Sequence, residues 1–140
     1  MSLIHIIAGV HVFRARLEES VAPKTCAAFR KLLPYRQKLI HARWSGEACW
    51  VPLGDFQLGV PPENAISKPA PGQILFYPGG ISETEILLPY GRSVFACKDG
   101  VLEGSPFLTV VDGLPQLAPL GRKVLWEGAQ DILFEAPPGR

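Results

Sequence analysis

The chain has 140 residues, of which 47% are hydrophobic and 19% charged, and its formal net charge is +1. This length and composition are typical of one globular domain and exclude a disordered chain. Basic residues never follow one another in runs longer than two, as in Arg122-Lys123, so the sequence lacks the concentrated basic stripe of a nucleic-acid-binding protein. We therefore expect a single domain over residues 1–140 and no nucleic-acid partner.

The cysteines and the apolar runs predict where the protein resides. Cys26, Cys49 and Cys97 form an odd, widely spaced set without a Cys-x-x-Cys pair. This pattern favours small buried thiols in a reducing cytoplasm over a disulfide framework or a structural zinc site. No apolar stretch approaches the roughly 18 to 20 residues that cross a bilayer, and residues 1–12 carry no signal-peptide pattern. We expect a cytoplasmic protein with no membrane partner, no metal and no cofactor.

Short apolar runs between turns rich in Gly and Pro predict a mostly β fold. In chain order we expect strands at 3–7 and 10–17, a helix at 23–33, strands at 38–44 and 47–52, a long irregular segment at 52–72, strands at 73–77, 83–88, 93–97 and 107–111, a short helical turn at 114–120, and strands at 124–126 and 131–135. Alternation in the second strand puts Phe13, Ala15 and Leu17 on one buried face. The apolar stripe of the helix includes Cys26 and Phe29. Such a series of short strands favours a barrel or a sandwich.

The pair Ser45-Gly46 predicts a tight hairpin turn. With a two-residue loop, Arg43 faces Ala48 and His41 faces Trp50, so His41, Arg43 and Trp50 share one face. An arginine fork suits a carboxylate, a histidine moves protons near neutral pH, and an indole supplies an apolar wall. The alternative is a solvent-facing wall on which Arg43 pairs with a surface carboxylate.

A second polar group comprises Ser82, Glu83 and Glu85. In an extended segment the two glutamates share a face, and two close carboxylates raise one another's proton affinity. One of them can then stay neutral near pH 7, which suits acid–base chemistry. The alternative is a solvated face, or ion pairs with Arg43 and Arg92.

Further side chains complete the candidate site. Trp44 and Glu47 lie at the hairpin tip, where a tryptophan suits recognition or a dimer contact, or else packs on a neighbouring loop. Tyr90 is expected in the pocket or the core, and Phe107 in a wall of the pocket. The expected catalytic residues are His41, Arg43, Glu83 and Glu85. The expected ligand-binding residues are Trp44, Glu47, Trp50, Ser82, Tyr90 and Phe107.

Two segments resemble cyclophilins. Pro23-Lys24-Thr25-Cys26-Ala27-Ala28-Phe29 resembles the family's Pro-Lys-Thr-x-x-x-Phe helix start, and Gly104-Ser105-Pro106-Phe107-Leu108-Thr109 resembles its Gly-Ser-Gln-Phe-Phe-Ile strand. Between them, His41 and Arg43 match a His-x-Arg motif. The resemblance implies that Arg43 corresponds to the arginine that contacts the substrate carbonyl in prolyl isomerases. Pro106 departs from the family's glutamine and cannot supply its hydrogen bonds.

Nearly the whole chain is similar to a bacterial family of uncharacterised cyclophilin-like proteins. The likeness is carried by residues 41–47, 77–85 and 125–131. It implies a small closed cyclophilin-like β-barrel with one main α-helix at about residues 23–33 and a short second helical turn at about 114–120. It implies no established reaction.

These observations favour a polar pocket for a small anionic or amide-bearing metabolite, with acid–base catalysis as one outcome. Whether the protein is an enzyme stays open. One alternative is a diverged peptidyl-prolyl isomerase or peptide-binding module. Another is a non-catalytic accessory or oligomerisation domain, for which we expect a homodimer.

Overall fold

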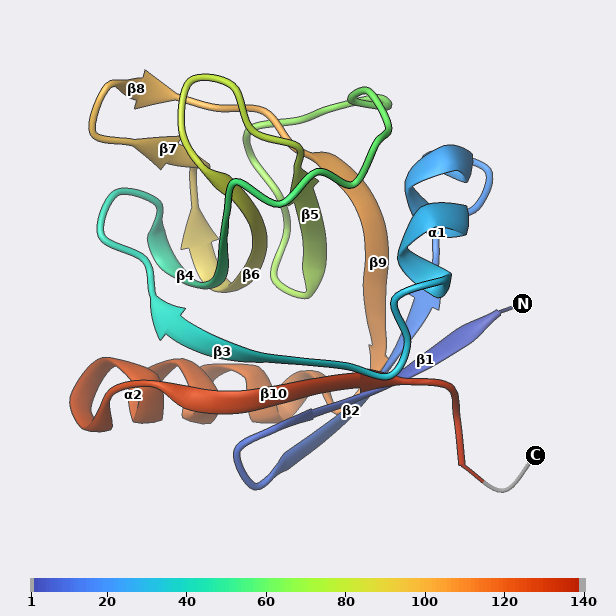
Figure 1. Cartoon of the computed structure of the whole chain (residues 1–140). Coiled ribbons are helices and arrows are strands. Elements are labelled where there is room, and N and C mark those ends of the chain that lie inside the picture. The colour runs from blue at the N-terminus through green and yellow to red at the C-terminus, as the bar shows by residue number, and fades with distance from the viewer. Residues whose placement is uncertain (1, 139–140) are drawn as a thin grey trace.

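Eight antiparallel strands close into a barrel in the computed structural model, which describes residues 2–138 (Figure 1). Around the barrel the strands follow the order β1, β10, β3, β4, β6, β5, β9 and β2. Their bounds are β1 Leu3–Ala8, β2 His11–Leu17, β3 Tyr35–His41, β4 Gly46–Gly54, β5 Gln73–Tyr77, β6 Thr84–Ser93, β9 Ser105–Asp112 and β10 Gln130–Glu135. Two short strands, β7 (Ala96–Cys97) and β8 (Gly100–Val101), form a separate ribbon. The expected closed, mostly β fold is confirmed.

The first hairpin shows how side-chain alternation determines which residues face the barrel interior. Gly9 has a φ of +59°, a conformation that glycine adopts without steric cost, and it turns β1 into β2. Phe13, Ala15 and Leu17 are buried, while Arg14 between them is exposed. The face predicted from the sequence is therefore the one that faces the core.

The expected first helix is confirmed as α1 (Pro23–Arg30), which ends three residues earlier than predicted. The backbone N–H groups of residues 31–33 donate to carbonyls three residues back, so the last turn tightens before Pro34. Cys26 and Phe29 are buried, as the apolar stripe predicts.

The second helical segment is confirmed and extends further than the sequence suggests. A 3-10 turn, η1 (Leu114–Gln116), leads into α2 (Leu117–Glu127). The strand expected at 124–126 is wrong, because these residues form the end of α2. The buried residues Leu117, Leu120 and Val124 recur at i, i+3 and i+7, which is one helical face.

Strand β6 continues through Pro89, where the sequence predicts a break. Pro89 pairs with Ala48 next to a shift of register in β4, and its carbonyl accepts a hydrogen bond from the Gly72 N–H at 3.0 Å. A proline donates no ladder hydrogen bond, so it is tolerated beside such an irregularity. The strand expected at 93–97 is divided between the end of β6 and β7.

Two hydrophobic clusters lie on the two sides of the barrel wall. The inner cluster includes Ile74, Phe76 and Ile86, together with residues of α1 and α2. The outer cluster uses the alternate residues of the same strands and comprises Ala48, Leu75, Tyr77, Leu87, Phe95 and Leu102. The wall made by β4, β5 and β6 is therefore buried on both faces.

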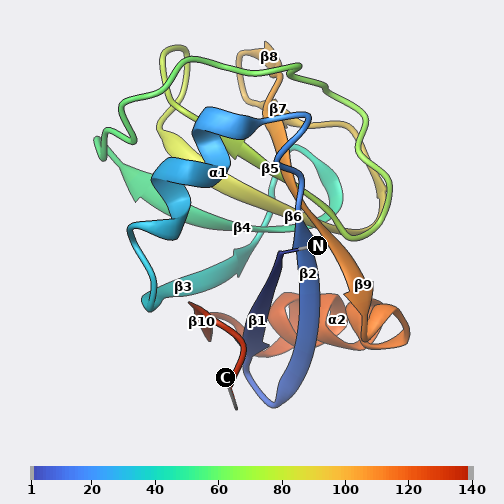
Figure 2. The ribbon, with the colours of Figure 1, turned by 90° about the vertical axis from the view of Figure 1, so that its right-hand side faces the viewer.

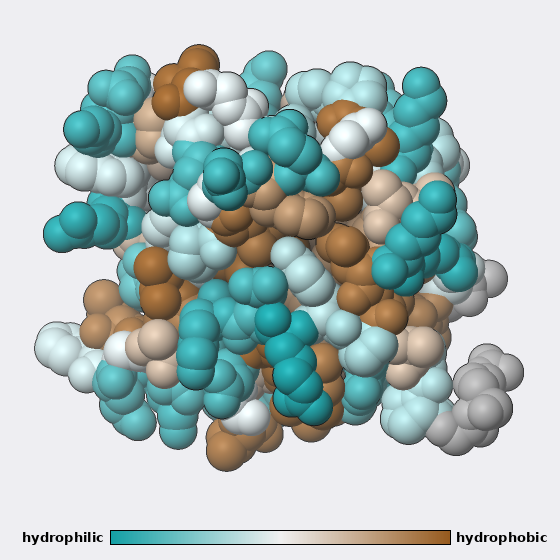
Figure 3. Space-filling view, in the orientation of Figure 1, coloured by the Kyte–Doolittle hydropathy of each residue, from teal (hydrophilic) through white to brown (hydrophobic). Residues whose placement is uncertain are grey.

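The two helices close the inner cluster from different sides. In both ribbon views α1 lies in the upper part of the molecule, above β10, whereas α2 lies at about the height of β10 (Figures 1 and 2). Hydrophilic residues are interspersed with hydrophobic ones over the face seen in Figure 3, with a hydrophobic band across its middle. None of the helices within residues 2–138 has the length and apolar character needed to cross a membrane.

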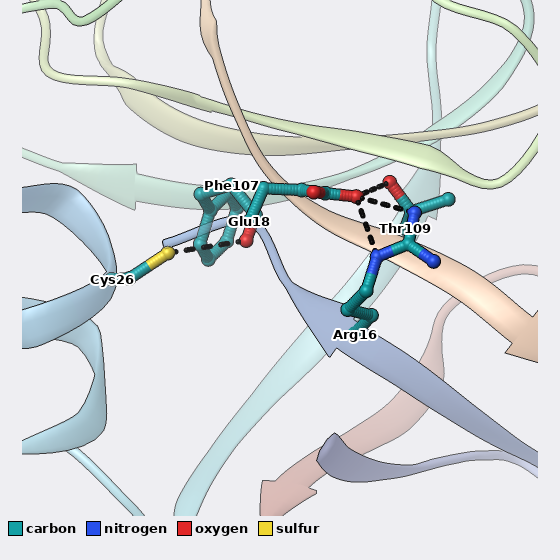
Figure 4. A network of polar contacts seen from close by, with 5 residues as sticks. All are labelled: Arg16, Glu18, Cys26, Phe107 and Thr109. Atoms are coloured by element: carbon teal, nitrogen blue, oxygen red, sulfur yellow. Dashed lines mark hydrogen bonds and ion pairs between the residues drawn. The ribbon is translucent and has the colours of Figure 1, made fainter. Parts of the chain in front are cut away.

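A polar network anchors the end of β2 to β9 (Figure 4). Glu18 accepts hydrogen bonds from Arg16 Nη2 at 2.8 Å and from the Thr109 hydroxyl at 2.6 Å. Burial opposes ionisation of Glu18, but these donors outweigh it and lower the pKa of its carboxyl. Nearby, the Cys26 thiol donates to the Phe107 carbonyl at 3.4 Å and ties α1 to β9.

Candidate functional site

A cavity of about 330 Å³ lies on the outer side of the barrel wall, beside the β7–β8 ribbon. Its lining comes from the β3–β4 loop, strands β4 and β6, the β5–β6 loop and the ribbon. Six of the residues expected from the sequence line it: Arg43, Trp44, Trp50, Ser82, Glu83 and Glu85. Larger hollows of about 510 Å³ near Pro69 and about 410 Å³ near Arg36 have no buried carboxyl group.

Strand alternation places Trp50 and Glu85 on the cavity side of the wall. Trp50 pairs with Leu87 across β4 and β6, and Leu87 belongs to the outer cluster. Ile86 and Leu88 point into the inner cluster. Because successive side chains of a strand face opposite ways, Glu85 projects outward like Leu87, into the cavity.

The β5–β6 loop is held in place by the phenol of Tyr77. Its hydroxyl oxygen accepts hydrogen bonds from the backbone N–H groups of Ile81 at 3.0 Å and Ser82 at 3.3 Å. Gly79 and Gly80 have φ values of +92° and +131°, which the turn requires and other residues rarely adopt. Tyr77 therefore fixes the cavity edge that carries Ile81, Ser82 and Glu83.

Ser45 fixes the opposite connection, the loop between β3 and β4. Its hydroxyl accepts from the Ala96 N–H at 3.1 Å and donates to the Ala96 carbonyl at 3.2 Å. The Ser45 carbonyl accepts from the Ser93 hydroxyl at 2.7 Å. These bonds join the loop carrying Arg43 and Trp44 to the chain leading into β7.

Among residues 2–138, Glu85 is the only buried ionisable side chain that lines this cavity. It is 7% exposed, and no group within those residues hydrogen-bonds to its carboxyl. Among residues 2–138, every side-chain oxygen that is completely shielded from solvent has a hydrogen-bond partner. The Glu85 carboxyl has no such partner, so its oxygens are open to the cavity. Burial, reinforced by the negative charge of Glu83, raises the pKa of Glu85 to about 8.

The remaining charges of the cavity lie at its exposed edge. Arg43 comes from the β3–β4 loop, and Lys98 and Asp99 come from the β7–β8 turn. Within residues 2–138 neither Arg43 nor Lys98 forms an ion pair. The Glu83 carboxylate accepts a hydrogen bond from the Gly54 N–H at 3.0 Å. Both cations are therefore available to a ligand.

A family model described as "Protein of unknown function (DUF3830)" matches residues 5–136. The chain belongs to this family. No curated protein matches the sequence.

Two solved structures resemble this DUF3830 protein in fold. One is the structure of McbB in complex with tryptophan, which has a TM-score of 0.75 and 19% identity over 98% of this chain and 45% of McbB. The chain thus spans less than half the length of McbB. The other is the solution structure of the hypothetical protein AF2241 from Archaeoglobus fulgidus, with a TM-score of 0.59 and 15% identity over 97% of this chain and 95% of that one. At these identities both likenesses show the fold alone.

His41 lies apart from the cavity of this DUF3830 protein. The expected hairpin register is wrong by one residue, because His41 pairs with Cys49 rather than with Trp50. The connection after β3 spans residues 42–45 instead of two residues, so His41 and Arg43 do not share a face. The His41 ring instead contacts the Tyr90 hydroxyl, with 2.7 Å between Nε2 and the oxygen.

Glu47 and Phe107 also lie outside the cavity. The Glu47 carboxylate accepts a hydrogen bond from the Arg92 N–H at 2.9 Å and packs against Gly91. Phe107 is fully buried in the inner cluster, where its ring contacts Phe29 with centroids 5.0 Å apart. The structure therefore brings six of the ten expected residues together and gives Tyr90, His41, Glu47 and Phe107 packing or hydrogen-bonding roles.

Sequence reasoning missed the contribution of the β7–β8 turn. Cys97, Lys98 and Asp99 line the cavity, although none of them was expected there. The two-residue loop is Lys98-Asp99, and the Asp99-Gly100 turn signal in the sequence marks its position. Where the ribbon folds back depends on contacts of Phe95 and Leu102 with the outer cluster, and a local pattern does not reveal these contacts.

The cysteines match the expectation of small buried thiols at two of three positions. Burial raises the pKa of Cys49 to about 12, and burial together with Glu19 raises that of Cys26 to about 11, so both are protonated at neutral pH. Cys97 is half-buried at the cavity. Within residues 2–138 no three His, Cys, Asp or Glu side chains are grouped to hold a metal ion.

Proposed function

We propose that the cavity beside β6 binds a small metabolite that carries an anionic or amide group, with Glu85 as the group that gives or takes a proton. The observation that carries this proposal is the Glu85 carboxyl, which is buried at the cavity without a hydrogen-bond partner among residues 2–138. An unpaired buried carboxyl destabilises a fold. Its presence on a wall otherwise built from apolar residues is explained by a ligand that hydrogen-bonds to it.

The other groups at the cavity suit the same class of ligand. Arg43 presents a planar fork for a carboxylate, and a neutral carboxylic acid at Glu85 can both donate to and accept from an amide. Trp50 and Ile81 supply apolar surface. A volume of about 330 Å³ is at the lower end of the range for metabolite pockets.

The same carboxyl is suited to acid–base catalysis. A group that titrates near neutral pH is both partly protonated and partly ionised under working conditions. Burial places the pKa of Glu85 at about 8, within this range. Protonated Glu85 is therefore our candidate for a general acid, with Arg43 holding the substrate.

The comparison with McbB supports a small-molecule function for a barrel of this shape. McbB was solved with tryptophan, a metabolite that carries a carboxylate. The present chain corresponds to 45% of McbB, and the identity is 19%. This likeness therefore supports the class of ligand and does not assign the residues that bind it.

A thermal-shift panel of small carboxylates and cyclic amides tests the proposal. A ligand at about ten times its Kd stabilises the folded state by roughly 1.4 kcal/mol, which raises Tm by several degrees. We expect the shift to disappear in Arg43→Ala and Glu85→Gln. The exposed Arg36→Ala serves as the matched control, because Arg36 lies on β3 away from this cavity. No shift with any compound, or equal shifts in all variants, would count against the pocket.

A diverged prolyl isomerase with a cyclophilin-like site is the second candidate. It is favoured by the place of Arg43 and Trp44, both exposed at an apolar hollow on the outer barrel wall. Pro106, which replaces the glutamine of the cyclophilin motif, is buried in β9 and does not line the cavity. A protease-coupled assay on an X-Pro peptide decides between the two, since turnover at the uncatalysed rate rejects the isomerase.

A further inference from the structure

The charges around the cavity are balanced only while Glu85 is neutral. Arg43 and Lys98 contribute two positive charges, and Glu83 and Asp99 contribute two negative charges. If Glu85 ionises, the lining carries one negative charge that no group of the lining offsets. The ligand that best matches this cavity is therefore one that brings its own cation to Glu85.

The surroundings of Glu85 leave this position free for a ligand cation. On the neighbouring strands Glu85 faces Pro52 from β4 and Tyr77 from β5. The Tyr77 hydroxyl already accepts from the loop at Ile81 and Ser82. The remaining titratable groups of the lining are Glu83, Arg43, Lys98, Asp99 and the Cys97 thiol. None of these cations pairs with Glu85.

We infer that the ligand is a zwitterionic α-amino acid with an apolar side chain, whose ammonium group binds Glu85 while its carboxylate binds Arg43. This inference rests on the proposed function and names the ligand class within it. The apolar side chain would lie against Trp50, Trp44 and Ile81, of which Trp44 and Ile81 are 58% and 71% exposed. A bound side chain would cover part of that exposed apolar surface.

Neither half of an amino acid satisfies the cavity alone. A plain carboxylate can bind Arg43 or Lys98 but leaves the buried Glu85 without a partner. A plain amine can bind Glu85 but leaves both cations without one. A zwitterion brings a cation to Glu85 and an anion to Arg43, so it is the class that gives both groups a partner.

Binding of an ammonium group must expel the proton from Glu85. With a pKa of about 8, roughly nine-tenths of Glu85 is protonated at pH 7. A cation in hydrogen-bond contact stabilises the carboxylate, so close to one proton per ligand is released to the buffer. An amide or an uncharged ligand that hydrogen-bonds to the neutral acid releases none.

Isothermal titration calorimetry measures this proton directly. L-Phenylalanine and L-leucine are titrated at pH 7 in phosphate and in Tris, whose ionisation enthalpies differ. The comparison compounds are N-acetyl-L-phenylalanine, which lacks the cation, and phenethylamine, which lacks the carboxylate. We expect the free amino acids to bind at least tenfold more tightly than either comparison compound and to release about 0.9 proton at this pH.

Substitutions at Glu85 and Arg43 test which group releases the proton and which group binds the ligand carboxylate. Glu85→Gln keeps the size and a hydrogen-bonding head group, so we expect a folded protein in which affinity for L-phenylalanine falls at least tenfold and proton release disappears. Glu103→Gln, at an exposed carboxylate outside the cavity, is the matched control and should retain the release. Arg43→Gln should weaken L-phenylalanine and N-acetyl-L-phenylalanine by the same factor.

The outcomes separate this inference from the proposed function. Binding of N-acetyl-L-phenylalanine or of cyclic amides without binding of free amino acids overturns the amino-acid inference and leaves the metabolite pocket standing. Binding of L-phenylalanine without proton release, or with undiminished affinity in Glu85→Gln, also overturns it. If neither free amino acid binds at millimolar concentration, the inference fails, and the carboxylate and amide panel decides the pocket.

Discussion

The hydrogen bonds of His41 assign its tautomer. The Ala42 carbonyl can only accept, so His41 Nδ1, 2.8 Å away, carries the proton. Nε2 is then an acceptor, and the Tyr90 hydroxyl donates to it at 2.7 Å. The Tyr90 ring in turn lies so close to α2 that a Cβ at Gly121 would come within 2.3 Å of it. The His41–Tyr90 pair thus joins the end of β3 to β6 and α2.

Removing the Tyr90 hydroxyl tests this structural role. Tyr90→Phe leaves the half-buried His41 Nε2 without its donor, and we expect a loss of about 1 kcal/mol in the free energy of unfolding. Urea denaturation measures this loss. Ligand binding at the Glu85 cavity should not change, because neither residue lines it. Unchanged stability would show that water replaces the hydroxyl at no cost.

The sequence predicts which side chains lie together at the site only where side-chain alternation along a strand is regular. Glu83 and Glu85 are two apart, and both line the cavity as an extended segment predicts. His41 and Arg43 are also two apart, but β3 ends at His41, and alternation does not continue into a loop. The failure at His41 therefore has a simple cause, the length of the β3–β4 connection.

At the scale of the elements, α1 depends on a carboxylate from a distant loop. The residue preceding the helix, Ala22, offers no side-chain cap. Glu63 instead accepts hydrogen bonds from the N–H groups of Thr25 at 2.7 Å and Lys24 at 3.1 Å, and from the Thr25 hydroxyl at 2.7 Å. Desolvation opposes its ionisation, but these bonds prevail and lower the pKa of Glu63. The long 52–72 segment thus supplies the cap that the helix lacks.

Glu63→Ala should therefore destabilise the protein by about 1 kcal/mol, the usual effect of losing a helix cap. The lowered pKa gives the sign of the pH dependence: the contribution is present above the ordinary glutamate range and is lost as pH falls through the folded-state value. Urea denaturation at pH 7 measures it, with the exposed Glu103→Ala as control. Equal effects of the two substitutions would contradict the capping role.

Elements with a clear period were predictable, and elements that depend on tertiary contacts were not. Strand β5 has the bounds that its apolar run predicts. Val124 to Trp126 has the composition of a strand, yet it completes the buried stripe of α2. Pro89 suggested a break in β6 because the sequence does not show the irregular pairing with β4 that accommodates it. In each case the missing information is the partner across space.

At the scale of the whole molecule, the barrel wall is covered on both sides, and the cavity lies where the outer covering is incomplete. The β7–β8 ribbon and the segment at Ile66 cover the outer faces of Leu75 and Leu87. Glu85 lies two residues before Leu87 on the same face of β6, at the end of the wall that this covering leaves open. A residue that destabilises the fold is thereby placed next to the opening through which a ligand would reach it.

The stability of the whole chain should therefore depend on pH through Glu85. At a pH below the ordinary pKa of glutamate, the Glu85 carboxyl is protonated in both the folded and the unfolded chain. Its ionisation then has no effect on the free energy of unfolding. As pH rises, the unfolded chain ionises first, while the folded chain keeps its proton until about pH 8, so stability falls across this window. The full loss is about 5 kcal/mol, because the pKa differs by about 3.5 between the two states. In Glu85→Gln this loss is absent, so we expect the variant and the wild type to match at pH 4.5 and the variant to be more stable at pH 8.5. Urea denaturation across this range, without ligand, measures the difference, and the three histidines cancel because both proteins contain them. Parallel stability curves for the two proteins would show that Glu85 ionises normally in the fold.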